Sequence, residues 1–212
     1  MLMSPSRSHT ARASRMIAAW KTSPAATLPS SRPLHDDVFA ANRVRTRVDL
    51  AVAASDGRSR VARLHEAGAL RVRFPNPVGL ALEAVTINTA GGIAGGDTLD
   101  IALAVGPGAA LTVTSAAAEK VYRAAGAPAR MSVRLDVAPA GHLVWLPQET
   151  ILFDRAEVER GIAIDLAEDA RLVLGEALVF GRGAMGEVMH EGRVLDRWRV
   201  RRAGRLVFAD TL

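Results

Sequence analysis

The chain of 212 residues contains no cysteine. This absence excludes a disulfide framework, a thiolate metal site and a catalytic thiol, and it is typical of proteins from a reducing compartment. Neither an H-x-x-x-H pair, which would suit zinc, nor a G-x-S-x-G nucleophile motif occurs. Histidine is sparse and scattered, at His9, His35, His65, His142 and His190. The sequence therefore offers little basis for catalysis by a thiol, a zinc ion or a serine triad.

Aromatic residues are also few, at 4% of the chain, and the net charge of +5 is concentrated at one end. Residues 1–33 contain five basic residues and no acidic residue, which accounts for the whole net charge. Residues 34–212 hold 22 basic and 22 acidic residues. A neutral folded part with so few aromatic side chains is a poor candidate for binding nucleic acid. We therefore expect no nucleic-acid partner.

Long hydrophobic runs are absent. Residues 101–118 carry no charge, but Gly106-Pro107-Gly108 interrupts them. The apolar run Met16–Trp20 is too short for a secretory signal. We expect no membrane association and a cytoplasmic location, with residues 1–35 as a disordered basic extension and residues 36–212 as the folded domain.

After residue 35, short apolar segments recur about every ten residues, each ended by Gly, Pro or Asp. Several alternate strictly between apolar and polar residues, as in Met131–Val137 and Ile162–Leu166. Only Ala116–Tyr122 suggests a helical turn or two. The pattern predicts a mainly β protein with few short helices. The predicted strands are Val44–Ala53, Arg60–His65, Ala69–Phe74, Leu80–Asn88, Leu99–Val105, Leu111–Thr114, Met131–Val137, Leu143–Leu146, Val158–Leu166, Leu172–Phe180, Arg197–Arg202 and Leu206–Phe208.

Three segments resemble one another: Ala102–Thr114, Arg134–Leu146 and Ala163–Gly175. They are offset by 32 and then 29 residues, and each has an amphipathic strand, a tight turn and a mostly apolar strand. Repeats that cannot bury a face alone must stack on their neighbours. We therefore expect stacked, layered strands, as in a flattened β-helix or a sandwich. The alternative is that the similarity reflects only coincidental hairpins.

Two glycine-rich segments need an interpretation. Gly181–Gly186 matches G-x-G-x-x-G, but no βαβ context surrounds it, so a turn or bulge is favoured over dinucleotide binding. Asn88–Asp97 contains two glycine pairs, which indicate positive φ angles or close backbone approach. This loop either joins two strands or closes against a partner or ligand, with Asp97 at its rim.

Carboxylates follow the apolar strand of each repeat, at Glu119, Glu149 and Glu176. In a stack of repeats, these side chains would lie near one another at the ends of adjacent rungs. Clustered carboxylates bind divalent cations or raise one another's pKa. The alternative is that all three are surface acids, or acids with structural hydrogen bonds.

Five motifs, in order over about residues 45–212, resemble the UreD family of urease accessory proteins, called UreH in some organisms. They are Ile87–Leu99, Ala118–Arg123, Trp145–Phe153, Glu176–Arg182 with Met185–Glu187, and Arg197–Arg199 with Leu206–Phe208. The resemblance implies a layered β fold, in agreement with the repeats. It also implies a non-enzymatic chaperone that helps to deliver nickel to apo-urease with UreF and, through UreF, the GTPase UreG.

The resemblance further implies an internal polar route along which nickel passes without being tightly bound. Asp97, Glu119 and Glu176 match acidic or polar family positions along that route, and the repeat argument adds Glu149. Family members extend beyond the point equivalent to Leu212, so we expect the domain to be truncated at its C-terminus. Two other functions remain open: a β-rich protein-binding module without a metal role, and a hydrolase built on stacked strands.

Overall fold

The computed structural model describes residues 43–76 and 79–212. These residues form strands and contain one short 3-10 turn, η2 (Gly183–Met185), but no α-helix. The strands are β1 (Arg45–Ser55), β2 (Arg58–Ala67), β3 (Leu70–Arg73), β4 (Leu82–Asn88), β5 (Thr98–Val105), β6 (Ala110–Ser115), β7 (Glu119–Val121), β8 (Ala129–Val137), β9 (His142–Trp145), β10 (Thr150–Leu152), β11 (Ala156–Leu166), β12 (Arg171–Leu174), β13 (Leu178–Phe180), β14 (Gly192–Arg202) and β15 (Arg205–Thr211).

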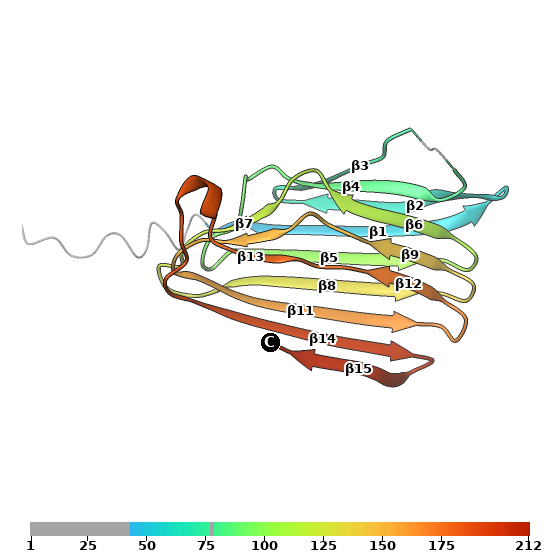
Figure 1. The fold of residues 1–212 in the computed structure, drawn as a ribbon. Helices are drawn as coiled ribbons and strands as arrows, with labels where there is room; N and C mark the ends of the chain where they lie inside the picture. Colours follow the sequence, from blue (N-terminus) through green and yellow to red (C-terminus); the bar gives the residue numbers. More distant parts are fainter. Residues whose placement is uncertain (1–42, 77–78) are drawn as a thin grey trace, which may run out of the picture. The chain divides into compact units, whose positions relative to one another are not determined.

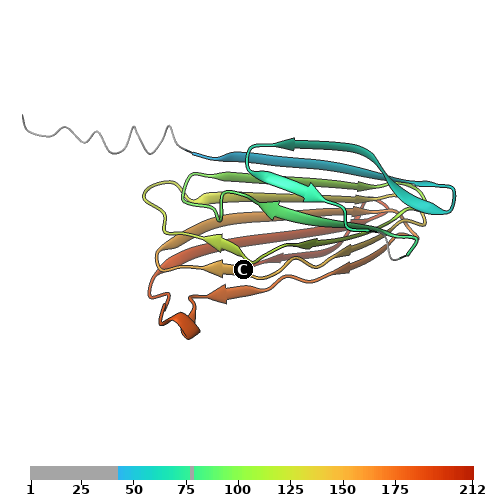
Figure 2. The same ribbon diagram turned by 90° about the horizontal axis from the view of Figure 1, so that it is seen from above.

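The strands build three sheets, which the chain visits in turn. A seven-stranded sheet has the order β15-β14-β11-β8-β5-β1-β2, a five-stranded sheet β12-β9-β6-β4-β3, and a three-stranded sheet β13-β10-β7. One circuit passes through β5, β6 and β7, the next through β8, β9 and β10, and the third through β11, β12 and β13. Equivalent strands of successive circuits pair in parallel. The result is a β-solenoid, whose stacked strands are visible from two directions in Figures 1 and 2.

The strand register confirms the predicted repeat and its spacing. In the seven-stranded sheet, Ala102 pairs with Arg134, and Arg134 pairs with Ala163, which are steps of 32 and 29 residues. The five-stranded sheet repeats the same steps through Leu111, Leu143 and Leu172. The two strands of each repeat belong to different sheets, so the repeats are rungs of a solenoid and not hairpins.

Period-two burial along these strands creates the core between the sheets. Leu103, Leu135 and Ile164 occupy one register row of the seven-stranded sheet, and all three are essentially buried. Each fully buried side chain of this size contributes about 1.5–3 kcal/mol relative to an exposed one. Their alternating neighbours, such as Arg134 and Asp165, face outward. The mainly β, layered fold class predicted from the sequence is confirmed.

Two predicted elements are wrong in detail. Ala116–Tyr122, predicted as a helical turn, contains strand β7, and the single predicted strand Leu172–Phe180 is divided into β12 and β13. Both errors concern the three-stranded sheet, whose strands have only three residues each, too few to establish a period of two. The Gly181–Gly186 motif forms a turn, as predicted, with positive φ at both terminal glycines.

The predicted extension, residues 1–35, lies outside the described residues. No helix within the described ranges is long and apolar enough to cross a bilayer.

Candidate functional site

A cavity of about 150 Å³, with a mainly apolar wall that also carries several polar side chains, lies where the three sheets face one another. Apolar side chains of the seven-stranded sheet, such as Ile101 and Val133, form part of its wall. A volume of this size has room for several water molecules, which polar groups can retain. The polar part of the wall comes from all three sheets and their connections and includes Asn88, Glu119, Gln148, Thr150, Arg160 and Glu176.

Glu119, at the start of β7, presents a partly buried carboxylate to this cavity. The side-chain amide of Asn88, at the end of β4, donates to both carboxylate oxygens, at 3.0 and 3.1 Å. Burial raises the pKa of Glu119, while the hydrogen bonds from Asn88 and the backbone N–H of Lys120, together with the Lys120 charge, act in the opposite direction. Within the described ranges, no basic side chain forms an ion pair with Glu119.

Glu176, between β12 and β13, also lines the cavity, but its carboxylate is fully engaged. Its Oε1 accepts a hydrogen bond from Trp145 Nε1 at 2.7 Å, and its Oε2 forms an ion pair with Arg160 Nη1 at 2.7 Å. Arg160 also donates Nε and Nη2 to the two carboxylate oxygens of Asp196, and Trp198 Nε1 donates to Asp196 Oδ2. The Arg160, Glu176 and Asp196 side chains are at most 7% exposed.

Asp97 is buried, but its carboxylate organises the backbone around it. Its Oδ1 accepts the N–H of Val44 at 2.9 Å, and its Oδ2 accepts the N–H of Ala94 at 2.8 Å. Asp97 therefore holds the double-glycine loop against the residue that precedes β1. It is not among the residues that line the cavity.

We expect Asp97→Ala to lower the free energy of unfolding by about 1–2 kcal/mol, the scale of losing a capping carboxylate. Urea denaturation would measure this effect. Asp100→Ala, at an exposed position on β5, should change stability by less than about 0.5 kcal/mol. Equal effects of the two substitutions would contradict the capping role.

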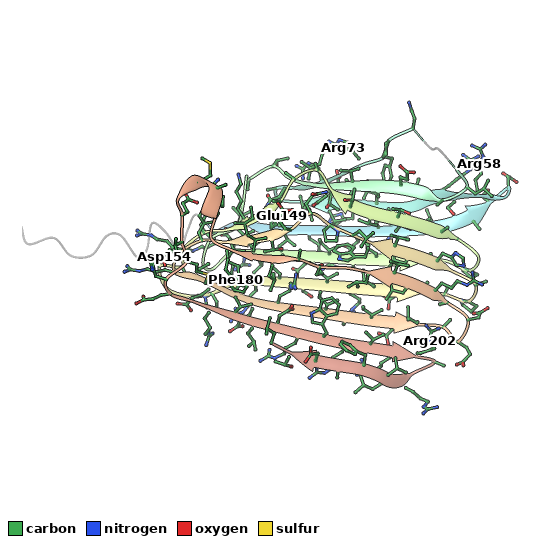
Figure 3. All side chains as sticks on the ribbon, viewed as in Figure 1. Arg58, Arg73, Glu149, Asp154, Phe180 and Arg202 are labelled. Carbon is green, nitrogen blue, oxygen red and sulfur yellow. The ribbon has the colours of Figure 1, made fainter. Side chains whose placement is uncertain are left out.

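Glu149, labelled in Figure 3, lies in the connection between β9 and β10. It is not among the residues that line the cavity. Its backbone carbonyl accepts the N–H of Glu119 at 2.9 Å. The rung position equivalent to Glu119 is Thr150, one residue later. Because side chains alternate between the two faces of a strand, a displacement of one residue directs the side chain to the opposite face.

The structure thus brings together two of the four acids predicted from the sequence, Glu119 and Glu176, on the wall of one cavity. Leu178 pairs with Thr150, and Glu176 lies two residues before Leu178. Because side chains two residues apart in an extended chain point to the same face, this position is compatible with Glu176 facing the cavity. Over the described part of the chain, no cluster of three or more His, Asp or Glu residues is arranged to hold a metal ion. Any cation in this cavity would meet few protein ligands.

The sequence analysis did not identify three polar residues of the site, Asn88, Arg160 and Asp196. Each occupies an inward-facing position in the alternating burial pattern of its strand, and that position could have identified it. Arg160 has the same parity in β11 as the buried Val158 and Ile162, and Asp196 occupies the corresponding inward parity in β14. Asn88 continues the inward alternation of β4. A charged residue at an apolar position of a strand predicts a buried ion pair, because an isolated buried charge is too costly.

The fold and its cavity define a class of protein: a β-solenoid with a cavity between its sheets whose wall includes two carboxylates, Glu119 and Glu176. The model of the UreD urease accessory protein family matches residues 44–212, and the chain belongs to that family.

Its curated relatives include urease accessory protein UreD of Rhodopseudomonas palustris strain BisB18, 59% identical over 175 residues. UreD 3 of Bradyrhizobium sp. strain BTAi1 is 57% identical over 176 residues, and UreD of Bradyrhizobium diazoefficiens is 55% identical over 175. These alignments cover 82–83% of the present chain and 63% of each relative. The chain therefore spans somewhat less than two thirds of the length of these relatives.

Proposed function

We propose that this chain acts in urease maturation, as a non-catalytic scaffold that helps to deliver nickel to apo-urease together with UreF and UreG. Membership of the UreD urease accessory protein family supports a role in maturation. The observation that carries the nickel role is the carboxylate of Glu119 on the wall of the cavity, which has no ion-pair partner in the described ranges. A carboxylate in this state can compensate the charge of a transient cation.

The chemistry of the cavity suits a metal that must be released again. Nickel stands high in the affinity order of divalent metals and is bound well by imidazole and thiolate ligands. Among the described residues, the cavity wall includes neither histidine nor cysteine, and its oxygen and amide groups would hold nickel weakly. Weak, exchangeable contacts suit transfer to another protein better than a tight site does. Nickel is thus proposed as cargo in transit and not as a resident cofactor.

Glu119→Gln should weaken the binding of Ni²⁺ by about tenfold or more, the scale of losing a functional group at a metal site. Titration calorimetry with NiCl₂ would measure this change, and activation of co-expressed apo-urease should fall in parallel. Glu149→Gln is the matched control, because it makes the same chemical change in the β9–β10 connection, outside the cavity wall. Equal nickel affinity in the Glu119→Gln variant and the unaltered chain would contradict the nickel role of Glu119.

The proposed partners can be tested separately from the metal. Tagged chain should co-purify with UreF, and with UreG only when UreF is present, and this complex should bind apo-urease. Failure to retain either UreF or apo-urease would contradict the scaffold role.

A second candidate is a β-rich protein-binding module without a direct metal role. Its support is a set of exposed apolar side chains on β13 and the segment that follows it. Soluble monomeric proteins rarely expose large apolar patches, and such patches often mark interaction sites. These residues are Val179, Phe180, Met185 and Val188, between 40% and 69% exposed. The nickel titration separates the two functions, because a module of this kind requires no saturable metal binding that depends on Glu119.

A further inference from the structure

The two carboxylates of the cavity differ in how far their charges are already neutralised. Glu176 has both oxygens engaged, one by the indole of Trp145 and one by the guanidinium of Arg160. Among the residues that the structure describes, Glu119 receives hydrogen bonds from neutral donors, the Asn88 amide and the backbone N–H of Lys120, and the Lys120 charge is adjacent. A cation in the cavity would therefore be attracted to Glu119, whereas near Glu176 it would face a fixed positive charge.

Arg160 cannot easily leave this position. Asp196 binds it through two hydrogen bonds on the side away from Glu176, and Trp198 orients Asp196 in turn. The network joins β9, the β12–β13 connection, β11 and β14, and the side chains of its three ions are almost completely buried. Rotation of the guanidinium would leave two buried carboxylates unpaired, which is strongly unfavourable.

We propose that Arg160 is an internal counter-ion that prevents Glu176 from acting as a second carboxylate ligand in the cavity. This inference rests on the proposed nickel route and adds the residue that sets its affinity. With Arg160 in place, the cavity offers a divalent cation one charged oxygen ligand, Glu119. Without it, a second carboxylate that lines the same cavity would become available to the cation and slow its release. Arg160 is thus a positioning residue that keeps the site weak enough for transfer.

A set of variants separates this role from a purely structural one. Arg160→Gln combined with Asp196→Asn removes one positive and one negative charge, so the network keeps its net charge of −1 while Glu176 loses its cationic partner. Titration of the purified chain with NiCl₂ should give a dissociation constant about tenfold lower than that of the unaltered chain, because a second charged oxygen becomes available. Adding Glu176→Gln to the pair should return the affinity to within about threefold of the original.

Two controls accompany these variants. One alters an ion pair between the same two strands, and the other alters Glu176 alone. Arg193→Gln with Glu159→Gln neutralises an exposed ion pair between β14 and β11 and should leave nickel affinity unchanged. Glu176→Gln alone should change nickel affinity by less than about threefold, because Glu176 is not a ligand while Arg160 is bound to it. Circular dichroism and thermal unfolding of each variant check that the solenoid is intact.

The possible results are distinct. Nickel binding that is not tightened in the folded Arg160→Gln/Asp196→Asn variant would overturn the inference, even if Glu119→Gln weakens binding as the proposed function requires. If the double variant does not fold, the single Glu176→Gln variant decides, since a tenfold loss of affinity there would make Glu176 a ligand and overturn the inference. Absence of saturable nickel binding in both the unaltered chain and the double variant would contradict the nickel route itself.

Discussion

Arg160→Met should lower the free energy of unfolding by about 3–5 kcal/mol, the scale of breaking a buried ion pair by removing one partner. The substitution leaves Asp196 and Glu176 as negative charges at most 7% exposed, without the guanidinium that compensates both. The indoles of Trp145 and Trp198 would still donate one hydrogen bond each, which is insufficient to replace a cation. Urea denaturation followed by tryptophan fluorescence would measure the change, since both indoles report on this network.

Arg193→Met is the matched control for this substitution. Arg193 lies on β14 and pairs with Glu159 at 3.0 Å, but its side chain is 59% exposed. An exposed pair of this kind contributes about 0–1 kcal/mol. Losses of similar size in the two variants would show that burial does not govern the contribution of Arg160.

Gly92→Ala should destabilise the double-glycine loop by about 3–5 kcal/mol, through both backbone strain and overpacking. Gly92 has a φ angle of 150°, and an added Cβ would lie 2.5 Å from Tyr122 Cε2 and 2.8 Å from the carbonyl oxygen of Lys120. That carbonyl is fixed because it accepts the N–H of Ile93 at 2.8 Å. Relief of the clash must therefore displace either the loop or strand β7, which carries Glu119.

Gly91→Ala provides the comparison at the adjacent residue. Its φ angle of 76° is also left-handed, but no atom of residues 43–76 or 79–212 lies within 4 Å of the position of an added Cβ. Only the conformational cost of about 1–2 kcal/mol remains. Thermal and urea unfolding of both variants would measure the difference, and equal losses would contradict the close approach at Gly92. Nickel titration of Gly92→Ala should show weaker binding, because Asn88 bonds both the Gly92 carbonyl and Glu119.

A buried network of one cation and two carboxylates is a costly feature for a solenoid core that is mainly apolar. Replacing such networks by apolar residues often leaves stability unchanged or raises it. Within the proposed function, the network at Arg160 has a use beyond stability, since it determines which carboxylate of the cavity is available to a cation. The proposed nickel affinity and the stability of the fold therefore depend on the same side chain.

The fold class and the rung spacing were determined by the sequence alone. Recurring apolar segments, several of them with period-two alternation, identified at least part of each longer strand, although β14 was predicted only from Arg197. The offsets of 32 and 29 residues are the same as those of the parallel register. This succeeded because burial on one face of a strand imposes its periodicity directly on the amino acids. Of the three-residue strands of the third sheet, β7 and β10 were not recognised and β13 was merged with β12, because too few residues carry the pattern.

The arrangement of the candidate site was decided by the tertiary structure. The sequence proposed four acids for one polar route, with Glu149 added by the repeat argument alone. In the structure Asp97 holds a loop, Glu149 lies outside the cavity wall, Glu176 is neutralised by Arg160, and Glu119 faces the cavity without an ion-pair partner in the described ranges. Sequence spacing gives the strand on which a carboxylate lies, but its charge state depends on partners that are distant along the chain. Arg160 is 36 residues from Asp196, and only the parallel stacking of β11 on β14 brings them into contact.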